Sequence, residues 1–170
     1  PVLYLLHGAG GDQTAWVQRG EILRITDNAI KDGKATPMII VMPDANTGQR
    51  GYFNEGEDWR YEDFFFEEFM PFIEKKYRIK AEKQYRAIAG LSMGGGGSFM
   101  YAMHHPELFS SACPLSSYIG PLTVEDLKKR NARRDFNYSD KEVTVYFKRQ
   151  NALELFKSVS LKAAIIRRFF

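Results

Sequence analysis

The chain has 170 residues, a length typical of one domain, and 44% of them are hydrophobic, which is enough to form a buried core. Its formal charge of +3 points to no particular partner, and no apolar run reaches the roughly 18 residues of a membrane-spanning helix. The single cysteine, Cys113, excludes a disulfide within the chain.

The first segment predicts a strand, a loop and a helix. Residues 2–6 form a continuous apolar run, typical of a strand that is covered on both faces. A glycine-rich loop follows at 7–12, and a helix is expected over 15–30. A natural protein rarely begins inside a strand of its sheet, so we expect residues to precede Pro1 in the source protein.

The middle of the chain repeats the alternation of strand and helix. Residues 38–42 are a second apolar strand, and 45–59 is a loop rich in glycine, asparagine and aromatic residues. From Tyr61 to Tyr77, aromatic and aliphatic residues recur at helical spacing, with Pro71 expected to bend the helix.

A third strand, 85–89, leads into Gly-Leu-Ser-Met-Gly at 90–94 and then a helix that ends near His105, and 109–115 is a further strand. Strands that alternate with helices predict an α/β domain with a mostly parallel sheet and helices on both faces. The last third differs, because it predicts charged helices near 123 and over 151–159, and then the opening of a strand at 163–170.

The pentapeptide at 90–94 matches Gly-x-Ser-x-Gly, which places a serine on a sharp turn between a strand and a helix. Ser92 is therefore the candidate nucleophile for acyl transfer. The oxyanion of such a reaction needs backbone N–H donors. We expect one from Met93, at the start of the helix, and the second from the 7–11 loop, at Ala9 with Gly10 next. The competing interpretation is a tight turn without chemistry.

The base for this serine is not evident. His104 follows Ser92 by 12 residues on the same predicted helix, about 18 Å away at 1.5 Å per residue. His105 has the same problem, so both are expected to be structural residues of the helix end. His7 is expected to fix the oxyanion loop by hydrogen bonds, with a role as base the alternative. The acidic residues after the serine, Asp126, Asp135 and Asp140, are expected to be exposed charges of helices or loops.

Other chemistries fit less well. Three histidines and one cysteine without ligand spacing predict no metal site. The glycine run lacks the ending of a phosphate-binding loop, and Gln13 stands where a dinucleotide fingerprint needs its third glycine. The basic cluster at 128–134 is flanked by Glu125, Asp126 and Asp135, which favours a solvated helix face over nucleic-acid binding. Trp59 and Tyr52 are candidates for stacking on a substrate ring, and equally for anchoring the loop and the core.

Three motifs together resemble the esterase D group of the α/β-hydrolase superfamily. They are Gly-Leu-Ser-Met-Gly-Gly from Gly90, Leu-Leu-His-Gly-Ala-Gly-Gly from Leu5, and Trp-Arg-Tyr-Glu-Asp-Phe-Phe from Trp59. Within that group the chain is most similar to carbohydrate esterases that remove feruloyl or acetyl groups from plant xylan. The resemblance is specific to about Ser117, and 119–160 resembles the variable cap before the acid-bearing strand.

The resemblance implies Ser92 as nucleophile, Met93 and Ala9 as donors, no metal or organic cofactor, and a small-molecule or polysaccharide ester as substrate. It also implies an aspartate and a histidine that have no matching position here, so we expect a partial α/β-hydrolase domain, truncated at both ends. A bacterial secreted or periplasmic location is favoured, without a nucleic-acid or membrane partner. The alternatives are a non-catalytic relative that binds carbohydrate or ester, and an acyltransferase.

Overall fold

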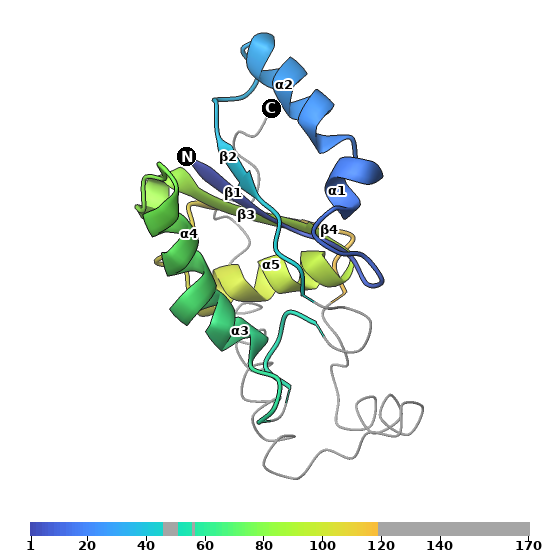
Figure 1. Ribbon diagram of the computed structural model, residues 1–170, viewed down its shortest axis with the longest axis vertical. Helices are drawn as coiled ribbons and strands as arrows, with labels where there is room; N and C mark the ends of the chain where they lie inside the picture. Colours follow the sequence, from blue (N-terminus) through green and yellow to red (C-terminus); the bar gives the residue numbers. More distant parts are fainter. Residues whose placement is uncertain (46–50, 56, 119–170) are drawn as a thin grey trace, which may run out of the picture.

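The computed structural model describes residues 1–45, 51–55 and 57–118 of the chain (Figure 1). The fold is built around a sheet of parallel strands in the order β2-β1-β3-β4. The strands are β1 Val2–Leu6, β2 Ile39–Val41, β3 Arg86–Leu91 and β4 Ser111–Leu115. The four strands predicted from the sequence in the described part of the chain are therefore confirmed, with small differences at their ends.

The two central strands carry the core of the sheet. β1 pairs with β2 on one side and with β3 on the other, and Tyr4 lies in register with Ile88 of β3. Tyr4 and Ile88 are both fully buried, and so is Leu6 at the end of β1. Successive residues of β1 are apolar because both faces of the sheet are covered.

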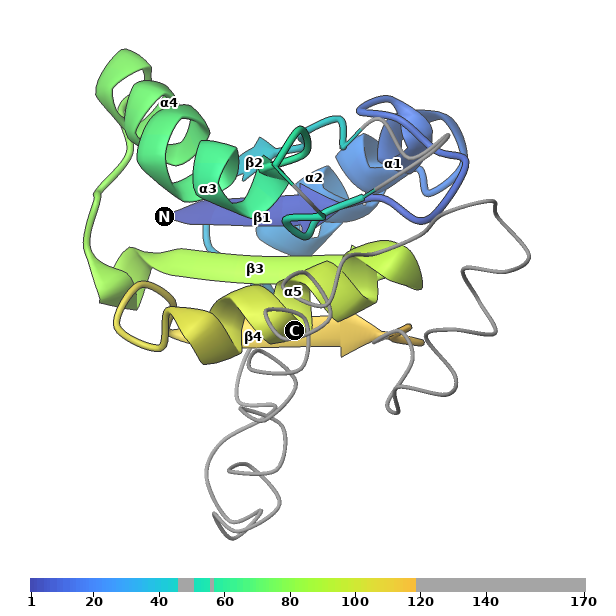
Figure 2. The same ribbon diagram turned by 90° about the horizontal axis from the view of Figure 1, so that it is seen from below.

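Helices lie on both faces of the sheet (Figures 1 and 2). On one face are α1 and α2, and on the other are α3, α4 and α5. This arrangement confirms the predicted parallel sheet with helices on both faces. The helices are α1 Ala15–Gln18, α2 Ile22–Lys31, α3 Tyr61–Asp63, α4 Met70–Lys76 and α5 Met93–His104, with a π-helical turn over Phe64–Phe69 and a 3-10 turn over Lys83–Tyr85.

The single helix predicted over 15–30 is wrong, because the structure divides this segment into α1 and α2. Between them, Glu21 adopts φ 47°, a left-handed conformation that ends a right-handed helix. Gly20 precedes it, and a Cβ at Gly20 would lie 2.9 Å from both the carbonyl oxygen and the ring of Trp16. The break brings α1 close to the end of β1, and that position matters for the site.

The helix predicted from Tyr61 to Tyr77 is present, with an irregular centre. A π-helical turn over Phe64–Phe69 immediately precedes Pro71, which stands in the first turn of α4. Proline has no N–H for the α-helical hydrogen-bond ladder, so a wider turn before it accommodates the lost bond. Where the sequence predicts a bend at Pro71, the structure has a π-helical turn just before it.

An aromatic cluster joins α5 and the α3–α4 segment to the sheet. The Phe65 ring is fully buried and lies 5.0 Å from the ring of Tyr101 on α5 and 5.5 Å from that of Tyr4 on β1. Edge-on and tilted contacts of this kind stabilise a core beyond the area they bury. The cluster therefore holds α5, and the serine before it, in place against β1 and β3.

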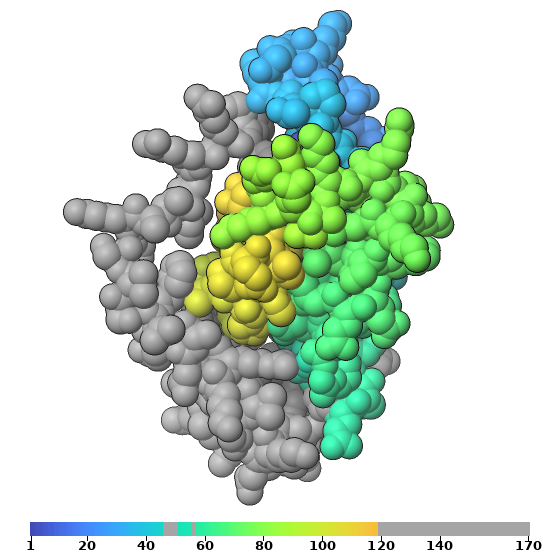
Figure 3. Space-filling model, turned by 90° about the vertical axis from the view of Figure 1, so that its left-hand side faces the viewer, coloured from blue at the N-terminus to red at the C-terminus, as the bar shows by residue number. Residues whose placement is uncertain are grey.

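Some apolar surface remains exposed in the described part of the chain. Leu23 and Ile25 of α2 are 58% and 45% exposed, and α2 forms a projection at one end of the molecule (Figure 3). Leu115 of β4 is also exposed. We expect such surface to make the isolated chain associate with itself. No helix among the described residues is long and apolar enough to cross a membrane.

The predictions for the last third of the chain lie outside the described residues. They are the helices near 123 and over 151–159, the strand opening at 163–170 and the cap at 119–160.

Candidate active site

Ser92 lies on the sharp turn between β3 and α5, at φ 55° and ψ −111°. A residue other than glycine at such a positive φ is strained by about 1–3 kcal/mol, and surrounding contacts must hold it there. The Ser92 N–H donates to the carbonyl of Leu115, and the Ser92 carbonyl accepts from the N–H groups of Gly96 and Tyr118, each at 2.9 Å. The residue is half-buried at the carboxyl edge of the sheet, as expected for a nucleophile on this turn.

The glycines on either side of Ser92 allow strand, helix and loop to approach one another. A Cβ at Gly90 would lie 2.2 Å from the carbonyl oxygen of Gly94, and one at Gly94 would lie 2.5 Å from that of Leu6. Both contacts are with backbone atoms, which cannot move aside as a flexible side chain can. The Gly-x-Ser-x-Gly pattern is therefore a steric requirement of this turn.

The glycine-rich loop after β1, residues 7–11, is the predicted donor loop. It packs against the turn at residues 90–94, which we call the elbow. The Gly11 N–H donates to the Gly8 carbonyl at 3.1 Å, and Gly10 supplies the φ of 71° that this turn needs. A Cβ at Gly8 would lie 3.6 Å from the Cβ of Ser92. The structure therefore brings Ser92 and the predicted donor loop together, with Ala9 and Gly10 exposed beside the serine.

Met93 is the first residue of α5, where backbone N–H groups have no acceptor within the helix. Its N–H is therefore available to a group bound at Ser92, and the positive end of the helix dipole favours negative charge there.

His7 fixes the donor loop from the side of the core. Its ring is buried, Nδ1 lies 2.9 Å from the Gly8 carbonyl oxygen, and Nε2 accepts from the Ala45 N–H at 3.2 Å. These partners place the proton on Nδ1, an assignment made from the hydrogen bonds, and leave Nε2 as acceptor. The Asp44 carboxylate lies 3.5 Å from Nε2. With both nitrogens engaged, His7 has the loop-fixing role we expected and not that of a base.

Tyr52 supports the same loop from behind. Its ring is fully buried, and its hydroxyl donates to the His7 carbonyl at 3.1 Å. The Tyr101 hydroxyl in turn donates to the Tyr52 carbonyl. Burial raises the pKa of both tyrosines, so both stay neutral donors. A ring with no exposed surface cannot stack on a substrate, so the substrate contact expected of Tyr52 is corrected to a supporting position.

Trp59 is half-buried on the loop before α3. Its indole N–H donates to the Gly51 carbonyl at 2.8 Å, and its ring stacks on Tyr61 at 6.0 Å and 20°. A Cβ at Gly51 would lie 3.0 Å from the sulfur of Met93, so this loop adjoins the elbow. Trp59 and Tyr61 also line a hollow of about 610 Å³. Its other lining residues are Asp58, Arg60, Asp63, Phe64, Glu67 and Glu68.

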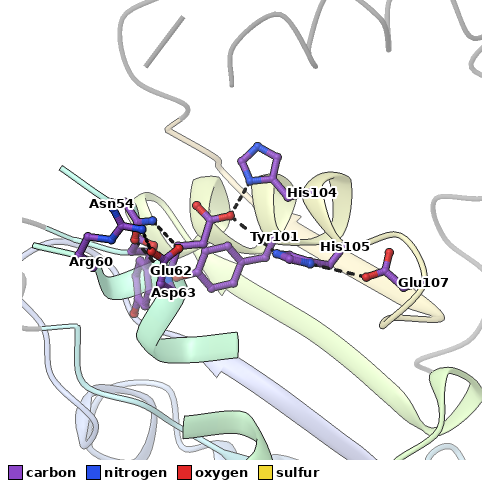
Figure 4. Close-up of polar contacts among 9 residues, drawn as sticks. Asn54, Arg60, Glu62, Asp63, Tyr101, His104, His105 and Glu107 are labelled. Carbon is purple, nitrogen blue, oxygen red and sulfur yellow. Dashed lines mark hydrogen bonds and ion pairs between the residues drawn. The ribbon is translucent and has the colours of Figure 1, made fainter. Parts of the chain in front are cut away.

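The other two histidines are held at the far end of α5 (Figure 4). His104 directs Nδ1 to the Glu62 carboxylate at 2.5 Å, and the His105 ring lies 3.8 Å from that of Phe66. Their helix starts beside Ser92, so both lie about 18 Å from it. The structure therefore brings none of the three histidines of the sequence to Ser92 in the position of a base. Among the described residues, no group of three or more His, Cys, Asp and Glu is placed to hold a metal ion.

Two residues that the sequence analysis missed, Trp16 and Arg19, lie beside Ser92. A hollow of about 310 Å³ opens at the serine, with walls from the donor loop, from Leu91 and from the segment that contains α1. Trp16 and Arg19 belong to that segment and are three residues apart, which puts them on one helical face. In the sequence, only this spacing could have indicated that Trp16 and Arg19 share a helical face. The break after α1 is what turns that face toward the serine.

The chain is similar in sequence to a group of known proteins. A family model described as "Putative esterase" matches residues 1–162. A protein of Xylanibacter ruminicola named "Endo-1,4-beta-xylanase/feruloyl esterase" is 41% identical over 137 residues, which are 78% of this chain and 18% of that protein.

Solved structures are similar as well. One titled "ferulic acid esterase" matches with a TM-score of 0.68 and 43% identity, over 71% of this chain and 46% of that one. A ferulic acid esterase from Anaeromyces mucronatus, solved in complex with ferulic acid, matches with a TM-score of 0.61 and 26% identity, over 71% of this chain and 47% of that one. The chain thus spans about half the length of these structures and less of the curated relative.

Proposed function

The chain belongs to the esterase family that matches its residues 1–162, and from that premise we propose that Ser92 is the nucleophile of a serine carboxylesterase. One observation carries this proposal. The strained serine at the end of β3 faces a glycine-rich loop whose Gly8 comes within 3.6 Å of it, measured from the Cβ position of that glycine. No other arrangement of residues in the described part of the chain fits acyl transfer as well.

The reaction proceeds through an acyl-enzyme. The Ser92 oxygen attacks the ester carbonyl carbon and loses its proton to a base, and the N–H groups of Met93 and Ala9 receive the negative charge of the tetrahedral intermediate. Gly10 offers the next N–H in the same loop. The alcohol leaves with a proton, and water then attacks the acyl-enzyme, releasing the acid and restoring the serine hydroxyl.

The substrates we propose are feruloyl or acetyl esters of plant polysaccharide. The relatives named feruloyl esterase support this choice, and so does the mixture of apolar walls and backbone donors around Ser92. Trp59 is proposed to stack on a sugar or phenolic ring, because it is half-buried on the loop that adjoins Met93.

The base decides how fast the reaction runs in these 170 residues. None of the three histidines is placed to take the Ser92 proton. That observation favours a second candidate, a relative that binds esters without cleaving them. Ser92 and the donor loop alone still predict a slow acylation, because an oxyanion hole and binding leave about 10³–10⁴-fold catalysis when a triad member is removed.

Imidazole added to the buffer tests the proposal by supplying the missing base. We expect p-nitrophenyl acetate to release p-nitrophenol faster with the chain than without it, and imidazole to raise the enzyme-dependent rate after the rate with imidazole alone is subtracted. Ser92→Ala should abolish this increment, and Ser117→Ala, which removes an exposed serine nearby, should keep it.

If Ser92→Ala keeps the increment, Ser92 is not the nucleophile. If the wild-type chain shows no increment at any imidazole concentration but binds methyl ferulate, the binding-only candidate replaces the esterase.

A further inference from the structure

The hollow at Ser92 is bounded on one side by residues that the reaction itself does not use. The hollow has a volume of about 310 Å³. The donor loop and Ser92 form one of its walls, and Ala15, Trp16 and Arg19 form another. This volume is at the lower end of the roughly 300–1,000 Å³ of small-molecule sites. An acetyl group would leave most of it empty.

Trp16 is fixed in this wall before any ligand arrives. Its indole N–H donates to the Leu6 carbonyl at 3.1 Å, at the end of β1. Gly20 packs against it so closely that a Cβ there would lie 2.9 Å from the indole ring. A ring held in this way offers a flat apolar surface at little entropic cost, which favours a planar ligand.

Arg19 adds a positive charge to the same wall. Its side chain is exposed and forms no ion pair with the described residues, in contrast to Arg24 on α2, which pairs with Glu21. The Asp12 carboxylate accepts the N–H and the hydroxyl of Thr14, which lower its pKa most, and the charge of Arg19 adds a smaller effect without an ion pair between the two. The guanidinium of Arg19 is therefore available to an oxygen atom of a bound molecule.

We propose that this wall selects the acyl group: Trp16 packs against a planar aromatic acyl group, and Arg19 binds an oxygen substituent on its ring. The proposal rests on the proposed function and names the residues that choose its substrate. With the ester carbon at Ser92, a ring joined to the carbonyl by a short unsaturated linker lies along Trp16. A hydroxyl or methoxy oxygen then reaches the cation at the rim. The donors at Met93 and Ala9 do not distinguish one acyl group from another.

A comparison of two esters tests the role of Arg19. Ser92→Ala protein is titrated with methyl ferulate and with methyl cinnamate, which has no ring oxygens, and binding is followed by saturation-transfer NMR. We expect Arg19→Gln to lower the affinity for methyl ferulate by about three- to tenfold, the effect of losing one hydrogen bond to a charged group near solvent. The affinity for methyl cinnamate should change by less than about twofold. Arg24→Gln, which removes the same charge from α2, should change neither.

The same titrations test Trp16. Trp16→Ala should weaken both aromatic esters by at least about fivefold, since the stacking surface is lost. Trp16→Phe, which keeps a ring and is the safer variant for folding, should retain most of the affinity. Val17→Ala, on the next residue of α1, should change neither ester. Urea unfolding of each variant shows whether it is folded.

Each remaining outcome overturns the proposal. If Arg19→Gln weakens both esters equally, Arg19 does not bind a ring oxygen. If folded Trp16→Ala binds both esters as tightly as its parent, or methyl ferulate binds no better than methyl acetate, α1 does not select the acyl group. The acylation of Ser92 by p-nitrophenyl acetate is a separate measurement, so the proposed function can stand when this inference fails.

Discussion

At the scale of single residues, the site depends on one strained backbone conformation. Ser92 is held at φ 55° by hydrogen bonds to Leu115, Gly96 and Tyr118, and by close contacts through Gly90 and Gly94. The strain directs the side chain toward the donor loop. A residue without a Cβ would adopt the same conformation more easily, so a change that relieves the strain at this position also removes the proposed nucleophile.

Replacing Ser92 tests this opposition. Ser92→Gly relieves about 1–3 kcal/mol of strain and loses about 0.4–1 kcal/mol to the more flexible unfolded chain, so we expect it to be about 1 kcal/mol more stable than Ser92→Ala. Urea unfolding of both variants gives the difference. If Ser92→Gly is the less stable of the two, the backbone at this position is not strained.

Sequence motifs identified the candidate nucleophile and its donor loop and missed the residues around them. The strand before Ser92 and the glycines beside it identify the elbow, because each has a local steric reason. Tyr52 was misjudged because nothing local separates an aromatic residue that enters the core from one that faces a substrate. Trp16 was missed because it reaches the site only through the packing of α1 against the end of β1.

At the scale of elements, a buried ion pair joins α4 to the sheet. Arg86 of β3 donates two hydrogen bonds to the Glu74 carboxylate, at 2.6 and 2.7 Å, and the Tyr4 hydroxyl of β1 donates to the same carboxylate at 2.9 Å. The hydrogen bonds to Glu74 raise the pKa of Arg86. Both charged side chains are about nine-tenths buried, so each depends on the other for its charge balance.

A double-mutant cycle measures this dependence. We expect Glu74→Met and Arg86→Met each to lower the free energy of unfolding by about 3–5 kcal/mol, because each leaves a buried charge alone. The double variant should lose less free energy of unfolding than the two single variants lose together. The exposed pair of Arg24 and Glu21 is the control, and its removal should have little effect. Additive losses at Glu74 and Arg86 would show that the two side chains are not coupled.

The order and type of the elements could be predicted from the sequence, whereas their irregularities could not. Continuous apolar runs identified the strands at 2–6 and 38–42, since buried parallel strands need apolar residues on both faces. The break after α1 depends on the left-handed Glu21 and on Gly20 packed against Trp16, which no helical period reveals. Pro71 signals an irregularity in its helix, but the sequence does not show that it takes the form of a π-helical turn and not of a bend.

At the scale of the whole molecule, buried tyrosines hold the layers together. Each is mostly or wholly buried, and burial raises the pKa of each phenol well above its usual value near 10. They are Tyr4 in the sheet, Tyr101 on α5, Tyr61 on α3 and Tyr52 in the loop behind the donors. The folded state therefore keeps four protons that the unfolded chain gives up in alkaline solution.

Alkaline pH should unfold the protein for this reason. Below about pH 10 the tyrosines are protonated in both states, and their contribution to stability is complete. Above it the unfolded state binds fewer protons, so the free energy of unfolding falls as pH rises. We expect phenolate absorbance from these four buried tyrosines to appear together with unfolding. Ionisation of all tyrosines near pH 10 with the fold intact would contradict this.

The most direct test of the central claim, that Ser92 is the nucleophile, is the site at which an alkyl fluorophosphonate labels the chain when imidazole supplies the base. Peptide mapping by tandem mass spectrometry should find one phosphonyl group, on Ser92. Ser116 and Ser117 are exposed but do not line the hollow at Ser92, and Ser98 is fully buried with its hydroxyl donating to Gly95, so all three should stay unlabelled. A label shared among the exposed serines, or equal labelling of Ser92→Ala, would contradict the claim.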